Sequence, residues 1–191
     1  MKIEALAIQG AYKIRAEYHE DQRGYFAEIF KADFFSTTIS PLPLIQENIA
    51  LSREVGTIRG LHAQQAPAAQ GKLLRVIRGK ILDMVVDVRP SSPSYGRVLA
   101  SLMPAAERLQ LWLPPGLLHG YQVLEADTEI SYQVSAAYAP QLEYGVIWND
   151  PELNLPWLDR GVVPLLSPKD QNLPSFGETR AAIAAGKLIP I

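Results

Sequence analysis

The chain has 191 residues, of which 48% are hydrophobic and 20% charged, and its formal net charge is −2. This length suits a single domain with a sizeable core, so we expect one domain over residues 1–191. The composition is that of a globular protein and excludes a disordered chain. A net charge this close to neutral provides no broad basic field, so we expect neither nucleic acid nor a membrane surface as a partner.

Cysteine is absent from the sequence, which excludes disulfides, thiolate metal sites and cysteine nucleophiles. Residues 1–21 carry charges throughout and lack the long apolar segment of a signal peptide. The sequence also lacks a run of about 18 apolar residues, the length that a membrane-spanning helix needs. We therefore expect a cytoplasmic protein.

The first predicted elements are short strands and one short helix. Residues 1–14, MKIEALAIQGAYKI, could supply edge strands to a partner chain, and KADFFS, residues 31–36, suits a helix of one or two turns. Hydrophobic alternation then dominates LLRVIRGKILDMVVDVR, residues 73–89, where every second residue from Leu82 to Val88 shares one strand face. Because Gly79 offers a turn in the middle, this pattern predicts a β-hairpin over residues 73–89.

The second half of the chain continues with short strands. They are expected at ERLQLWLP (107–114), TEISYQVSAAY (128–138) and YGVIWND (144–150). Beyond Trp157 prolines and turn residues accumulate, and ETRAAIAAGKL suits a helix that ends at Gly186. Short strands separated by glycine and proline, with little helical periodicity, predict an all-β sandwich or barrel with short peripheral helices.

Histidine is scarce, since the chain has three. His119 follows a Pro-Pro-Gly corner, and this P-x-G-x-x-H turn resembles the second motif of cupin barrels, whose histidine points into the barrel mouth. Metal-binding cupins also carry an H-x-H pair, whereas Gln64 stands two residues after His62. Catalytic metal sites usually supply three or more good ligands, and Arg59 and Lys72 would repel a cation. We therefore expect no metal.

Four residues would suit enolisation, the removal of a proton next to a carbonyl, if they shared one barrel mouth. They are His62, Lys72, His119 and Tyr132. A neutral imidazole can remove a proton from a carbon next to a carbonyl, and a nearby cation can stabilise the resulting oxyanion. An inward tyrosine could return a proton from the opposite side, which would invert the centre. To act as a base beside cations, His62 needs a carboxylate partner. The residues alone leave four candidates open: Asp83, Asp87, Asp170 and Glu143.

A series of short motifs runs along most of the chain. They are RGYFAEIF (23–30), QEN (46–48), RGLH (59–62), QGKLLRVIRG (70–79), DVRPSSPSYGR (87–97), LWLPPGLLHGY (111–121), WNDPELNLPW (148–157) and LLSPKD (165–170). Each motif is weak alone, but in this order, and together with the strand that carries Tyr132, they are highly specific. The sequence resembles the dTDP-4-dehydrorhamnose 3,5-epimerase family of deoxysugar nucleotide enzymes.

The resemblance implies a cupin-type double-stranded β-helix, or jelly-roll, barrel that forms a homodimer and uses no metal or organic cofactor. It implies a nucleotide-sugar substrate, a dTDP-4-keto-6-deoxyhexose epimerised at C3 and C5 through enolates of the C4 carbonyl. By motif, His62 matches the base and Tyr132 the proton donor on the other face. Asp170 matches the carboxylate paired with the base, and Lys72 the group that stabilises the enolate oxygen.

The resemblance also implies which residues line the nucleotide-sugar site. They are Arg23, Phe26, Glu28, Gln46, Asn48, Arg59, His119, Tyr138, Glu143 and Lys169. Among them, His119 would lie close to the sugar. Phe26 and Tyr138 are candidates for stacking on the base.

Three alternatives remain open, and the first follows from departures of the chain from the family pattern at a few positions. Ala63 stands where an aromatic residue is usual, and Gln133 and Ala136 depart from the usual Y-K-x-T-D strand. These changes alter the pocket but keep the base, acid and lysine. The alternatives are an epimerase of C3 or C5 alone, a 3,4-ketoisomerase, and a non-catalytic nucleotide-sugar-binding cupin. Retention of both His62 and Tyr132 favours inversion, because a ketoisomerase can shuttle a proton on one face. Intact His62, Tyr132 and Asp170 argue against a binding protein, since pure binding does not require that acid–base set.

Overall fold

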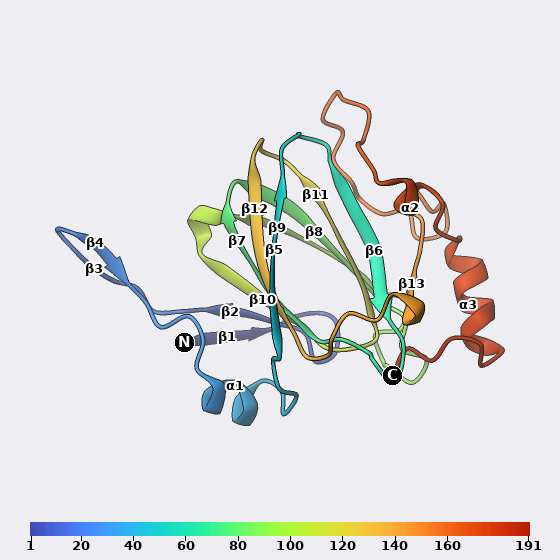
Figure 1. The fold of residues 1–191 in the computed structure, drawn as a ribbon, viewed down its shortest axis with the longest axis horizontal. Helices are drawn as coiled ribbons and strands as arrows, with labels where there is room; N and C mark the ends of the chain where they lie inside the picture. The colour runs from blue at the N-terminus through green and yellow to red at the C-terminus, as the bar shows by residue number, and fades with distance from the viewer.

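A computed structural model describes residues 1–191 as two antiparallel β-sheets that face each other and form an open barrel (Figure 1). The strand order is β1-β2-β10-β7-β12-β5 in the six-stranded sheet and β13-β6-β11-β8-β9 in the five-stranded sheet. A separate two-stranded hairpin, β3–β4, projects from the barrel. The predicted all-β barrel with short peripheral helices is therefore confirmed.

The strands have the following bounds. The six-stranded sheet contains β1 (Lys2–Ala5), β2 (Tyr12–Arg15), β10 (Leu109–Leu113), β7 (Lys72–Arg78), β12 (Thr128–Val134) and β5 (Gln46–Ser52). The five-stranded sheet contains β13 (Glu143–Gly145), β6 (Ile58–Gln64), β11 (Leu117–Val123), β8 (Lys80–Asp87) and β9 (Val98–Pro104). The projecting hairpin consists of β3 (His19–Asp21) and β4 (Gly24–Phe26).

The helices lie outside the barrel (Figure 1). They are α1 (Ala32–Thr38), α2 (Pro168–Gln171) and α3 (Phe176–Ala184), with 3₁₀ turns η1 (Ala105–Glu107) and η2 (Pro140–Leu142). Helices α1 and α3 occur where the sequence predicts them, and Gly186, with φ +69°, follows the end of α3. None of the helices is long and apolar enough to cross a membrane.

The β-hairpin predicted over residues 73–89 is wrong. Both strands exist, but β7 pairs with β10 and β12, whereas β8 pairs with β9 and β11 in the other sheet. Gly79 makes the corner between the sheets with φ +82°, and a Cβ there would lie 2.2 Å from Oγ1 of Thr128. A residue with a side chain would not fit at this corner, which explains the glycine. The glycine between two alternating runs therefore lies where the chain crosses from one sheet to the other, not at a hairpin turn.

Two further predicted strands differ in extent or in partner. The strand expected over residues 144–150 ends at Gly145, and the Ile147 N–H donates to the Pro174 carbonyl oxygen instead of to a strand of the sheet. The N-terminal strands β1 and β2 do form a sheet edge, but β2 pairs with β10 of the same chain. Strands β10 and β12 lie within the ranges predicted for them.

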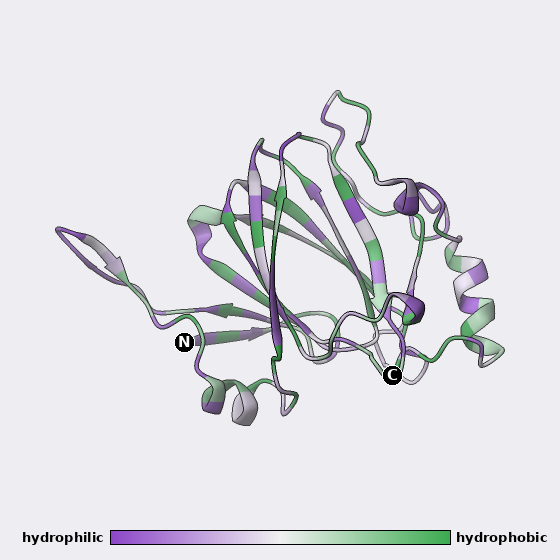
Figure 2. Ribbon diagram, in the orientation of Figure 1, coloured by the Kyte–Doolittle hydropathy of each residue, from purple (hydrophilic) through white to green (hydrophobic).

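The core consists of three hydrophobic clusters in layers. One fills the barrel between the sheets and includes Leu74, Val85 and Ile130. A second packs the outer face of the five-stranded sheet against the C-terminal segment, and a third packs the outer face of the six-stranded sheet against α1. Both faces of several strands are thus buried. Figure 2 shows hydrophobic and hydrophilic residues alternating along β6, because its outer face packs in the second cluster and its inner face carries polar side chains. The inward faces leave room at one end of the barrel for polar side chains.

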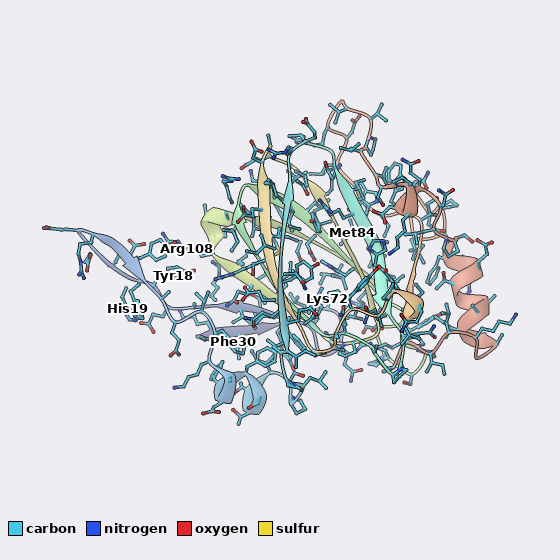
Figure 3. The ribbon with its side chains drawn as sticks, in the orientation of Figure 1. Tyr18, His19, Phe30, Lys72, Met84 and Arg108 are labelled. Atoms are coloured by element: carbon cyan, nitrogen blue, oxygen red, sulfur yellow. The ribbon has the colours of Figure 1, made fainter.

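The hairpin β3–β4 is anchored to the barrel by an arginine between two tyrosines. The Arg108 guanidinium lies 4.5 Å from the ring centre of Tyr18 and 4.2 Å from that of Tyr25. It also donates to Glu20 at 2.9 Å. Figure 3 shows Tyr18 and Arg108 together at the base of the hairpin. Cation–π contacts and an ion pair therefore fix an element too small to be stable alone.

Candidate active site

A cavity of about 490 Å³ lies between the two sheets. Strands β6 and β11 form one wall, β7 and β12 form the facing wall, and α2 with the segment before it borders the opening. All four residues predicted to be catalytic line this cavity: His62, Lys72, Tyr132 and Asp170. Figure 3 shows Lys72 in the middle of the molecule, between the strands of the two sheets.

On the wall of the five-stranded sheet, His62 is paired with a buried carboxylate. Nε2 of His62 lies 2.5 Å from Oδ1 of Asp170, which comes from α2 and is 3% exposed. Ser167 caps this one-turn helix by accepting a hydrogen bond from the Asp170 N–H at 3.1 Å. The cap orients the carboxylate toward a histidine that is distant in sequence.

The protonation states of this pair follow from its contacts. Burial raises the pKa of Asp170, but hydrogen bonds from His62 and Ser167 outweigh burial and hold the pKa below its usual value. An ionised Asp170 accepts the proton on Nε2, so neutral His62 carries its lone pair on Nδ1. Nδ1 lies 3.8 Å from Oε1 of Glu143, another residue of the cavity. The basic nitrogen therefore points toward the cavity.

Tyr132 and Lys72 occupy the facing wall, on adjacent strands of the six-stranded sheet. Burial raises the pKa of Tyr132, which keeps its hydroxyl protonated at neutral pH. Burial lowers the pKa of Lys72 to about 8, and the Glu143 carboxylate opposes that shift. The wall opposite the base thus presents a proton donor and a cation whose charge is easily lost.

A second histidine–carboxylate pair lies beside the first. His119 is the cross-strand partner of His62, and its Nε2 lies 2.6 Å from Oδ2 of the fully buried Asp83. Gly60 and Gly120 allow the two strands to approach here, because a Cβ at either would lie 2.6 Å from a carbonyl oxygen of the other strand. Two imidazoles therefore face the same space with their ring orientations fixed by aspartates.

Charged and aromatic side chains surround the cavity mouth. Oε2 of Glu143 accepts hydrogen bonds from the Tyr138 hydroxyl at 2.8 Å and from Nζ of Lys169. Burial raises the pKa of Glu143, but these two donors outweigh burial and lower it overall. Arg59 is held on the other side by Ser52 and by the Leu51 carbonyl oxygen. Arg59 and Lys169 thus offer positive charge to an anionic ligand at the mouth, with Lys169 already paired with Glu143.

Five of the predicted binding residues do not line this cavity. Arg23 and Phe26 lie on the projecting hairpin, where Phe26 is 72% exposed. Glu28 borders a separate hollow on the outer face of the six-stranded sheet. Gln46 and Asn48 bond to each other on β5, in register with Val134 and Tyr132. The chain thus brings Arg59, His119, Tyr138, Glu143 and Lys169 together and leaves the hairpin residues apart.

The structure adds Tyr121 to the cavity environment and gives Gln64 and Asp83 places that the sequence did not predict for them. Gln64 and Tyr121 line the cavity, and Asp83 orients His119. Gln64 and Tyr121 each stand two residues after a histidine on the same strand, so period-2 alternation could have identified them. The pairing of Asp83 with His119 has no local signal, because it depends on the register of β8 with β11.

The arrangement can remove a proton on one side of a bound molecule and deliver one on the other. A base projects from one sheet, a phenol projects from the facing sheet, and Lys72 lies beside the phenol. Side chains of His, Asp and Glu do not gather in a group of three or more that could hold a metal ion.

Comparisons with known proteins agree with this geometry. A family model described as dTDP-4-dehydrorhamnose 3,5-epimerase matches residues 5–178. A dTDP-4-dehydrorhamnose 3,5-epimerase of Sinorhizobium fredii is 40% identical over 178 residues, which cover 93% of this chain and 91% of the relative.

Two solved structures have the same fold. The dTDP-6-deoxy-D-glucose-3,5-epimerase of Legionella pneumophila, in complex with dTDP-4-keto-L-rhamnose, superposes with a TM-score of 0.88 at 30% identity, over 100% of this chain and 98% of that one. A 3′-monoepimerase of Streptomyces bikiniensis, in complex with dTDP-quinovose, gives a TM-score of 0.86 at 35% identity, over 96% of this chain and 91% of that one. The chain therefore belongs to the dTDP-4-dehydrorhamnose 3,5-epimerase family of isomerases, which has the predicted cupin-type β-barrel.

Proposed function

We propose that this enzyme epimerises a dTDP-linked 4-keto-6-deoxyhexose at C3 and C5, using its own side chains as acid and base. One observation carries the proposal: His62 and Tyr132 line facing walls of one cavity. A base and an acid on opposite sides of a sugar ring are what inversion requires. A ketoisomerase can move a proton on one face and does not need this arrangement.

In the proposed mechanism His62 removes the proton next to the C4 carbonyl through Nδ1. Asp170 stabilises the imidazolium that forms, because it lies 2.5 Å from Nε2 and is ionised. Lys72 stabilises the negative charge that develops on the enolate oxygen. Tyr132 then donates its proton to the carbon from the facing wall, which inverts the centre. Proton exchange with solvent resets both groups for the second carbon.

The nucleotide part of the substrate would lie at the mouth of the cavity. Arg59 and Lys169 offer positive charge to the pyrophosphate, and Tyr138 offers an aromatic face to the base. The ligands bound to the Legionella and Streptomyces relatives, dTDP-4-keto-L-rhamnose and dTDP-quinovose, support a dTDP-sugar. The Streptomyces relative is a 3′-monoepimerase, so inversion at one centre is the second candidate.

We further propose a homodimer in which the hairpin β3–β4 reaches the cavity of the partner. Arg23 and Phe26 match substrate-binding positions, yet they lie on an arm that points away from the cavity of their own chain (Figure 1). The anchoring of this arm by Arg108 supports a fixed, functional direction. Light scattering is expected to give the mass of a dimer. A monomer at working concentration would contradict this arrangement.

The test of function is proton exchange in deuterium oxide with dTDP-4-keto-6-deoxyglucose, followed by proton NMR. Loss of both the C3 and C5 signals with inversion supports the 3,5-epimerase, and loss of one signal supports a single-centre enzyme. Movement of the carbonyl to C3 would instead indicate a ketoisomerase. Binding of dTDP without any exchange would indicate a non-catalytic binding protein.

The matched variant for this test is His62→Asn, which keeps an amide nitrogen in place of the ring. It is expected to bind dTDP like the wild type and to exchange neither proton. Unchanged exchange in this variant would exclude His62 as the base.

A further inference from the structure

Gln64 is a buried residue of the cavity for which the proposed mechanism gives no role. It lies on β6 two residues after His62, so both side chains point to the same face of the strand, and it is 3% exposed. Its amide makes three hydrogen bonds, all to backbone atoms. Nε2 donates to the carbonyl oxygens of Ala68 at 2.7 Å and Ala137 at 3.1 Å, and Oε1 accepts from the Ala139 N–H at 2.8 Å.

Two of these three bonds flank Tyr138 on either side. The segment 135–139 connects β12 to η2 and has no strand partner of its own. Backbone bonds hold its two ends, since the Ser135 N–H donates to the Gly71 carbonyl oxygen and the Ala139 carbonyl oxygen accepts from the Leu142 N–H. Between them side chains bond the backbone, because Gln70 also donates to the Ala136 carbonyl oxygen at 2.7 Å. Tyr138 is therefore the one residue of the segment whose neighbours on both sides are held by the same amide.

Tyr138 needs such support because its ring is 57% exposed and lies at the mouth of the cavity. Its hydroxyl donates to Oε2 of Glu143, which also accepts from Lys169. An exposed ring on an unsupported loop would have to be ordered each time a ligand binds, at a cost in affinity. A loop already held in place avoids that cost.

We propose that Gln64 is a positioning residue that fixes Tyr138 for binding of the nucleotide part of the substrate. The inference rests on the proposed function and deepens it. Gln64 acts through the backbone of residues 137–139 and touches neither the sugar nor the reacting atoms. Its loss should therefore weaken binding of dTDP and raise KM, while kcat of the bound substrate is retained.

The experiment is a double-mutant cycle between Gln64→Leu and Tyr138→Ala, read out as the Kd of dTDP by calorimetry. Gln64→Leu keeps the side-chain size and removes all three hydrogen bonds. It is expected to weaken dTDP binding about tenfold, the effect of one side chain that must be immobilised on binding. In the Tyr138→Ala background the same change should have no further effect, because the residue that it positions is absent. The kcat of Gln64→Leu should stay within about threefold of wild type.

A matched control is Gln122→Leu. Gln122 is 2% exposed and also holds a loop by both ends of its amide, donating to the Leu158 carbonyl oxygen at 2.8 Å and accepting from the Leu158 N–H at 2.9 Å. This loop does not carry Tyr138, so the variant should lower the melting temperature and leave the Kd of dTDP unchanged. If Gln64→Leu does not fold, Gln64→Glu replaces it in the cycle, because it keeps the acceptor for Ala139 and loses the donor to Ala137.

Each outcome decides the question. Additive effects of Gln64→Leu and Tyr138→Ala, or equal weakening of dTDP binding by Gln122→Leu, would overturn the role of Gln64 and leave the proposed function intact. A wild-type chain that binds no dTDP and exchanges no proton would overturn the proposed function, and this inference with it.

Discussion

Replacing Asp170 by asparagine tests the origin of the basicity of His62. The change keeps the shape of the side chain 2.5 Å from Nε2 of His62 and removes its charge. In the wild type that charge stabilises the imidazolium formed when His62 takes a proton. At an effective dielectric constant of about 20, unit charges about 4 Å apart attract each other by about 4 kcal/mol.

This energy sets the size of the expected effect. About 4 kcal/mol of lost transition-state stabilisation corresponds to a rate that is about a thousandfold lower. Asp170→Asn should therefore lower kcat for proton exchange by about three orders of magnitude, without a change in dTDP affinity. The assay is deuterium incorporation at saturating dTDP-4-keto-6-deoxyglucose, followed by proton NMR, with the Kd of dTDP measured in parallel.

Asp159→Asn is the matched control for Asp170→Asn. Its carboxylate lies in an exposed loop, where Oδ1 accepts a hydrogen bond from the Gly161 N–H. The same chemical change at that place should leave the rate unaltered. An Asp170→Asn enzyme that folds, binds dTDP and turns over within about tenfold of wild type would refute the reasoning.

Three further predictions concern the facing wall of the cavity and its ions. Tyr132→Phe should still exchange the substrate protons, because His62 remains, but inversion should fall at least a hundredfold, about the value of a general acid; NMR separates the two events. As pH rises through about 8, Lys72 loses its proton, so the rate of the wild-type enzyme should fall. Lys72→Arg should move this alkaline limb of the pH–rate profile beyond pH ~10, because arginine stays charged. The pH–rate profiles of the two enzymes measure both effects. Treatment with a chelator should leave exchange unchanged, because the proposed acid, base and cation are all side chains.

Each of these predictions has a contrary outcome. Parallel loss of exchange and inversion in Tyr132→Phe would place Tyr132 in proton abstraction. An alkaline limb that stays in place in Lys72→Arg would assign the ionisation to another group. Activity lost on chelation and restored by a divalent cation would contradict a cofactor-free mechanism.

The sequence predicts the positions of the strands well, because these depend on local patterns. It predicts their partners less well, because strand pairing depends on residues far apart in the chain. Alternation identifies β12, and Pro114 marks the end of β10, because face and turn preferences act over a few residues. The turn at Gly79 looks the same whether the chain stays in one sheet or crosses to the other. The crossing shows only in the strand partners, since β7 pairs with β10 and β12 and β8 with β9 and β11, all of which lie farther along the chain.

Much of the candidate site could be predicted because its motifs have a fixed order, but its pairings could not be derived from the residues alone. Asp170 is 108 residues from His62, and the residues alone offer four carboxylates as its partner, of which the resemblance implies Asp170. In the structure Asp83 pairs with His119, which depends on the register between strands, and Asp87 pairs with Arg89, which depends on local turn geometry. The sequence pattern also cannot predict that Arg23 and Phe26 lie away from the cavity, because their position depends on the direction of the projecting hairpin.

The placement of the base and the acid on separate sheets has a consequence for how substrate range can change. Ile130 and Tyr121 line the cavity on the same two walls and also belong to the hydrophobic core between the sheets. A larger or smaller residue there alters the depth and width of the space without touching His62, Tyr132 or Asp170. If the proposed acid and base are right, we therefore expect that substitutions at such positions can change which sugar fits while the acid and the base stay in place.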